Sequence, residues 1–142
     1  MSLQVKIIPC RTDNYSYMCI DNKNNAFVVD PSEFMPVDEF IKTNNLNLKY
    51  ILNTHHHFDH VGGNIELKEK YGAKIVGNKN DKDRIPGIDI YLIEGEFFEF
   101  NEYRAEIIDI PGHTIGHIAF YIQSENIVFT GDTLFSLGCG RI

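Results

Sequence analysis

The sequence has 142 residues, of which 43% are hydrophobic and 12% aromatic, and its formal net charge at pH 7 is −7. This length and composition predict one folded domain over residues 1–142, rather than a disordered chain or two separate domains. The negative charge and the lack of any run of basic residues argue against nucleic acid and anionic membranes as partners.

Neither a membrane span nor a targeting segment is recognisable. No apolar stretch approaches the roughly 18 residues that a transmembrane helix requires, and the start "MSLQVKIIPCRTDN" lacks the long apolar run of a signal peptide. The three cysteines, Cys10, Cys19 and Cys139, are odd in number and form no CxxC pair. We therefore expect reduced thiols in a cytoplasmic protein.

The first half of the chain mixes strand-like and helix-like segments. Apolar runs rich in β-formers occur at "VKIIP", "YSYMCI" and "NAFVV", the last of which Pro31 stops. Residues 36–44 place apolar side chains at helical spacing. The strand-like "KYILNT" then leads into a histidine-rich stretch, and "NIELKEKYG" reads as a second helix that Asn64 can cap and Gly72 ends.

The second half of the chain is mostly strand-like. "AKIVG" reads as a strand, and the polar "NKNDKDRIPGID" reads as a surface loop. Five further strand-like runs follow: "IDIYLI", "EFFEF", "YRAEIIDI", "HIAFYI" and "NIVFTGD". Strands and helices mixed early, followed by strands, predict a layered α+β sandwich.

All six histidines lie in two short patches. Four of them fall in "NTHHHFDHVGGN", residues 53–64, and the other two, His113 and His117, lie in "PGHTIGHI". Imidazole and carboxylate groups are the usual nitrogen and oxygen ligands of Zn²⁺. Four such rings in one loop would repel each other when protonated, and would be costly to bury without partners. We therefore interpret the patches as metal-binding rather than merely structural.

The spacing of the first patch favours a strand end or a loop. His55 and His57 are two residues apart, so an extended backbone presents both rings on one side. Asp59 and His60 are adjacent, and the glycines that follow permit a tight bend that could aim both at a second point. The spacing therefore suggests two neighbouring metal positions.

Two more candidate ligands follow strand-like runs. His113 comes directly after "YRAEIIDI", and Asp132 comes directly after "NIVFT". Side chains at strand ends can converge on one rim of a sheet, although Asp132 taken alone would be an ordinary turn residue. We assign His117 to structural support ahead of ligation, and His56 to a supporting or solvent-facing position.

The pattern HxHxDH at residues 55–60, followed by His113 and Asp132, resembles the metallo-β-lactamase superfamily. The blocks "IPCRTDNYSYMCID", "VVDPSE", "NTHHHFDHVGGN", "IPGHTIGHIAFY" and "TGDTLFSLGCGRI" together look like the glyoxalase II (hydroxyacylglutathione hydrolase) family. These blocks run from Ile8 to Ile142. The resemblance implies an αββα sandwich with a metal site on one edge of its two sheets.

The resemblance also implies roles for individual residues. It gives six ligands for two zinc ions: His55, His57 and His113 at the first, Asp59 and His60 at the second, and Asp132 between them. Iron or manganese could take the place of zinc. The implied reaction is hydrolysis of S-D-lactoylglutathione to D-lactate and glutathione, in which Asp59 orients a hydroxide or accepts its proton. Arg141 would bind a glutathione carboxylate, although a terminal surface arginine is an equal reading.

The family pattern continues beyond "GCGRI" with the last elements of the sandwich, a further histidine ligand and a C-terminal helical domain. We therefore expect an incomplete domain that binds its second metal weakly, or binds one metal only. We also expect self-association through the uncovered edge.

Two functions stay open at this point. The chain is either a glyoxalase II-type thioesterase or a metal-binding but catalytically impaired fragment of one. Another superfamily member, such as a persulfide dioxygenase, is a further alternative.

Overall fold

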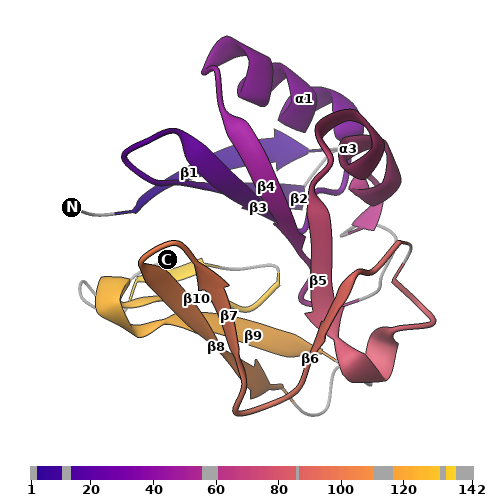
Figure 1. The fold of residues 1–142 in the computed structure, drawn as a ribbon, viewed down its shortest axis with the longest axis vertical. Helices are drawn as coiled ribbons and strands as arrows, with labels where there is room; N and C mark the ends of the chain where they lie inside the picture. Colours follow the sequence, from indigo (N-terminus) through magenta and orange to yellow (C-terminus); the bar gives the residue numbers. More distant parts are fainter. Residues whose placement is uncertain are drawn as a thin grey trace.

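The computed structural model describes residues 3–10, 14–55, 61–85, 87–110, 117–131 and 134–136. In this part of the chain two β-sheets face each other, and helices α1 (Phe34–Thr43) and α3 (Asn64–Tyr71) lie on the outer side of one sheet (Figure 1). The described elements therefore form a layered α+β sandwich, as the sequence predicts.

The sheet under the helices has six strands in the order β1-β2-β3-β4-β5-β6. Strands β1 to β3 are antiparallel, and β3 to β6 are parallel. Helix α1 connects β3 to β4 and α3 connects β4 to β5, because parallel neighbours need a crossover connection. The strand bounds are β1 Gln4–Cys10, β2 Asn14–Ile20, β3 Asn25–Val29, β4 Asn47–Leu52, β5 Lys74–Asn78 and β6 Ile90–Leu92.

The second sheet has five strands in the order β11-β10-β9-β8-β7, and all neighbours are antiparallel. Its strands are β7 Phe97–Phe100, β8 Tyr103–Asp109, β9 Ile118–Ile122, β10 Ile127–Phe129 and β11 Leu134–Ser136. Two short 3-10 helices, η1 (Lys79–Asp81) and η2 (Gln123–Glu125), complete the described elements.

The side-chain pattern of each strand explains its place in the layers. In β3, Phe27 and Val29 face the other sheet while Ala26 and Val28 face the helices, so the strand is apolar on both sides. Strand β8 instead alternates buried residues with more exposed ones such as Arg104, which is the pattern of a sheet with one solvated face.

Aromatic side chains fill much of the core between the sheets. Phe27 lies edge-on to Phe98 and Phe100, with ring centroids 5.5 and 5.0 Å apart. Such edge-to-face pairs contribute beyond the area that they bury. This core fixes how the two sheets sit on each other, and therefore where their strand ends meet.

The helix boundaries differ in detail from the sequence prediction. Helix α1 begins at Phe34, two residues before the predicted start, and Pro36 lies in its first turn, where a missing N–H costs little. Gly72 ends α3 in the left-handed conformation, with φ of 70°, as predicted. None of the described helices has the length and apolar composition needed to cross a bilayer.

The prediction that the Asn64 side chain caps α3 is wrong. Gly63 is the N-cap residue, and no side-chain hydrogen bond caps the helix. The Asn64 amide pairs with Asn53 instead.

Candidate metal centre

His55 is the one predicted ligand that lies within the described residues. The other predicted site residues lie outside them: His57, Asp59, His60, His113, Asp132 and Arg141. Within the described ranges, no three His, Cys, Asp or Glu side chains are grouped closely enough to hold a metal ion. The structure does place the chain segments that lead to and from the other predicted ligands.

Three of these segments begin at strand ends that lie next to one another. β4 leads to His55, the residues after β8 include His113, and β10 leads to Asp132. The rings of His55 and His117 are stacked, with centroids 4.6 Å apart and 25° between their planes, which joins the end of β4 to the start of β9. The His117 Nε2 atom lies 2.9 Å from the Thr130 carbonyl oxygen, which adds the end of β10. These contacts agree with a structural role for His117 beside the site.

Backbone hydrogen bonds also connect these strand ends. The Ile118 N–H donates to the Thr54 carbonyl at 2.8 Å, and the Ile110 N–H donates to the His117 carbonyl at 2.9 Å. Gly131 passes so close that a Cβ there would lie 3.1 Å from His117 Nε2 and 3.2 Å from Thr54 Oγ1. Its φ of 110° is also one that favours glycine.

A buried hydrogen-bond chain runs from Asp30 through Thr54 to His55. Thr54 donates twice to the Asp30 carboxylate, from its hydroxyl to Oδ2 at 2.6 Å and from its N–H to Oδ1 at 2.9 Å. The same hydroxyl oxygen lies 2.9 Å from His55 Nδ1. A metal-binding histidine ordinarily hydrogen-bonds through the ring nitrogen that does not face the metal. The surroundings of His55 therefore fit a metal ligand.

The two ends of the histidine-rich loop are joined by a buried amide pair. Asn64 Nδ2 donates to Asn53 Oδ1 at 2.6 Å, and Asn53 Nδ2 donates to Asn64 Oδ1 at 3.3 Å. Beside this pair, the Gly63 N–H donates to the Pro31 carbonyl at 2.7 Å, and a Cβ at Gly63 would lie 3.1 Å from that oxygen. These contacts fix where the loop leaves and rejoins the sandwich.

Thiolate ligation is disfavoured at the cysteines of the described part of the chain. Cys10 and Cys19 are free and buried, and burial raises the pKa of the Cys19 thiol. Imidazole and carboxylate groups therefore stay the predicted donor set of this centre.

The sequence alone does not identify Asp30, Thr54, Gly131 or the Asn53–Asn64 pair as supports of the site. Weak signals were present, since Asp30 directly follows a buried strand and the two asparagines flank the histidine patch. Nothing in the sequence shows which of these side chains touch.

The sequence profile of the metallo-beta-lactamase superfamily matches residues 11–142. The chain belongs to this superfamily.

More particular relatives are named as hydroxyacylglutathione hydrolases. The chain is 58% identical over 141 residues to the hydroxyacylglutathione hydrolase of Pelagibacter ubique (strain HTCC1062), covering 99% of this chain and 59% of that protein. It is 46% identical over 141 residues to the enzyme of that name from Methylococcus capsulatus (strain ATCC 33009 / NCIMB 11132 / Bath), covering 99% of this chain and 55% of the relative. The chain thus spans little more than half the length of these relatives.

Solved structures show the same fold. The BLEG-1 B3 metallo-beta-lactamase superposes with a TM-score of 0.83 at 22% identity, covering 93% of this chain and 73% of that one. ETHE1 from Myxococcus xanthus gives 0.75 at 23% identity, covering 92% of this chain and 56% of that one. The predicted metallo-β-lactamase-like fold is therefore confirmed.

Proposed function

We propose that the chain is a metal-dependent thioester hydrolase of the glyoxalase II type, which converts S-D-lactoylglutathione to D-lactate and glutathione. The observation that carries this proposal is the meeting of three strand ends at His55, each leading into a segment with predicted ligands. The similarity to hydroxyacylglutathione hydrolases over 99% of the chain supports the choice of substrate.

Six side chains are proposed as ligands of zinc. They are His55, His57 and His113 at a first position, Asp59 and His60 at a second, and Asp132 bridging the two. Because their donor set is imidazole and carboxylate, iron or manganese would also be accepted.

Divalent ions in such a site lower the pKa of bound water and polarise a carbonyl oxygen. Side chains of the protein supply the other catalytic and binding functions. Asp59 orients the attacking water and accepts its proton. Arg141 offers a guanidinium that matches a glutathione carboxylate. The free thiols Cys10 and Cys19 support a cytoplasmic location for this chemistry.

A second candidate is a metal-binding domain with impaired catalysis. The matched span covers 59% and 55% of the two relatives, so turnover by this span alone is the property to measure. The two candidates share the metal site and differ in turnover.

The two candidate functions are distinguished by measuring the release of glutathione thiol from S-D-lactoylglutathione. We expect zinc-dependent turnover by the chain that is lost in His57→Ala and Asp59→Asn, with folding checked by circular dichroism. The matched control His56→Ala makes the same kind of change in the same loop and should keep turnover. Bound zinc without turnover would favour the impaired domain, and turnover that survives both ligand changes would contradict the proposed site.

A further inference from the structure

The Thr54 hydroxyl carries one proton, and the structure indicates where that proton lies. The two oxygens of Asp30 accept from the hydroxyl and from the N–H of Thr54, at 2.6 and 2.9 Å. A hydroxyl that has given its proton to a carboxylate can only accept from its other neighbours. Its contact with His55 Nδ1, at 2.9 Å, therefore requires a proton on that nitrogen.

A neutral imidazole carries one proton, so a proton on Nδ1 leaves the lone pair on Nε2. We infer that Asp30 and Thr54 are positioning residues that hold His55 in the Nδ1–H tautomer and so present Nε2 to a metal ion. This inference rests on the proposed metal-dependent function. Neither Asp30 nor Thr54 is a proposed ligand, and both act through His55.

The three groups are shielded from water and held in place. Asp30 and Thr54 are fully buried, and His55 is 2% exposed. The Asp30 backbone is fixed by hydrogen bonds from Ser16 Oγ and to the Leu52 carbonyl, each 2.8 Å long. Its φ is 51°, a conformation that costs free energy for a residue other than glycine. Strain of this kind persists where the surroundings fix the backbone, which they do here.

The same contacts would also be present if they served only to hold the end of β3 against the end of β4. The tautomer of His55 distinguishes this structural role from the positioning role. The ring ¹⁵N shifts of His55 in metal-free protein, under alkaline conditions that keep imidazoles neutral, distinguish Nδ1–H from Nε2–H. His55→Ala identifies the signals. The wild-type chain should show Nδ1–H.

Two substitutions should reverse or release this tautomer. In Asp30→Asn, the side-chain oxygen still accepts the Thr54 N–H, so the amide NH₂ faces Thr54 Oγ1 and frees the hydroxyl proton for His55. We expect Nε2–H. Thr54→Val removes the hydroxyl and should give a mixture, whereas Thr54→Ser keeps the hydroxyl and should restore Nδ1–H.

Zinc affinity provides a second readout. It should fall about 10- to 100-fold in Asp30→Asn and Thr54→Val, and stay near the wild-type value in Thr54→Ser. Thermal unfolding separates these effects from loss of structure, and if one weakened variant fails to fold the other still decides. An Nε2–H ring in the wild type, or a tautomer unchanged in the folded variants, would overturn the inference. Because the tautomer is measured without metal or substrate, failure of the proposed hydrolase would leave this result standing.

Discussion

Gly131 passes close to two side chains of the candidate site. Replacing it with alanine would bring a Cβ to 3.1 Å from His117 Nε2 and 3.2 Å from Thr54 Oγ1, at a φ of 110°. We expect Gly131→Ala to lower the free energy of unfolding by about 2–4 kcal/mol, through strain and displacement of neighbours together, and to weaken zinc binding.

Gly95→Ala is the matched control, because Gly95 has a φ of 92° and a Cβ added there would meet nothing within 4 Å. It should lose only about 1–2 kcal/mol, the strain alone, and keep its zinc affinity. Chemical denaturation measures both variants, and equal losses in the two would contradict the packing role of Gly131.

At the scale of single residues, the sequence proposes ligands but does not identify the residues that support them. The ligands form a local pattern, since HxHxDH fits within residues 55–60. The supports depend on contacts between distant residues, because Asp30 meets Thr54 across 24 positions and Gly131 meets Thr54 from the other sheet. Local spacing carries no information about such contacts.

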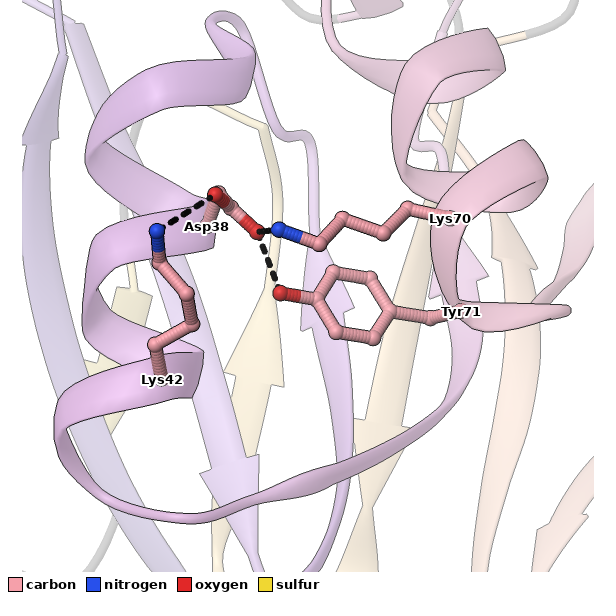
Figure 2. A network of polar contacts seen from close by, with 4 residues as sticks. All are labelled: Asp38, Lys42, Lys70 and Tyr71. Carbon is pink, nitrogen blue, oxygen red and sulfur yellow. Dashed lines mark hydrogen bonds and ion pairs between the residues drawn. The ribbon is translucent and has the colours of Figure 1, made fainter.

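At the scale of elements, α1 and α3 are joined by one buried carboxylate (Figure 2). Asp38 on α1 accepts hydrogen bonds from Lys70, at 2.8 Å, and from Tyr71, both on α3, and it pairs with Lys42 on its own helix at 3.4 Å. Burial raises the pKa of Asp38, but the hydrogen bonds from Lys70 and Tyr71 and the charges of both lysines outweigh it and leave the pKa below its usual value.

A carboxylate with a lowered pKa stabilises the fold above its unfolded pKa, and this contribution is lost as the pH falls through the folded value. We expect the free energy of unfolding to fall below about pH 4, and to fall less steeply in Asp38→Asn. Urea denaturation across the acid range measures this. Equal slopes in wild type and variant would contradict the role of Asp38.

Tyr71→Phe tests the same network at neutral pH. It removes a hydrogen bond to a buried carboxylate and should cost about 1–2 kcal/mol of unfolding free energy. Lys42→Ala is the control: the Lys42 side chain is 62% exposed, so its loss should cost less than about 0.5 kcal/mol. A larger loss for Lys42→Ala than for Tyr71→Phe would contradict the role of the buried hydrogen bond in joining the helices.

The Asn53–Asn64 pair gives a prediction for the histidine-rich loop. Asn64→Ala leaves the buried Asn53 amide without this partner, so we expect a loss of about 1–3 kcal/mol together with weaker zinc binding. Asn47→Ala breaks a similar but exposed pair with Asn25 and should change stability little. Zinc titration and denaturation of the two variants check this, and indistinguishable behaviour would contradict it.

Helices α1 and α3 and strands β1 to β10 correspond to segments that the sequence predicts. The buried strand "NAFVV" and the Gly72 helix end were correct, because apolar runs and left-handed glycines are local properties. Strand β11 has three residues and was not separated from the motif around it. The Asn64 cap was wrong because a distant amide, Asn53, binds that side chain.

The two outer faces of the described sandwich are covered differently. In the described part of the chain both α-helices cover the six-stranded sheet, and neither lies on the outer face of the five-stranded sheet (Figure 1). That face carries Phe97, which is 40% exposed with the Arg104 guanidinium 4.3 Å from its ring centroid, and the partly exposed Tyr121 and Val128. Exposed apolar side chains that neighbour each other are typical of surfaces that associate.

We therefore predict self-association of the 142-residue chain through this face. Sedimentation should show a dimer or larger species, and Phe97→Glu should shift it toward monomer. Tyr91→Glu changes an aromatic residue on the other sheet that is 47% exposed, and it should have no such effect. A stable monomer at all concentrations would contradict the prediction.

We propose that the histidine-rich loop and the neighbouring strand ends form a metal centre, and zinc titration of the metal-free chain is its most direct test. We predict at least one tightly bound equivalent, which His55→Ala and His57→Ala each abolish in a folded chain, and a second that binds more weakly. Zinc binding that is absent, or that persists in both variants, would contradict the claim.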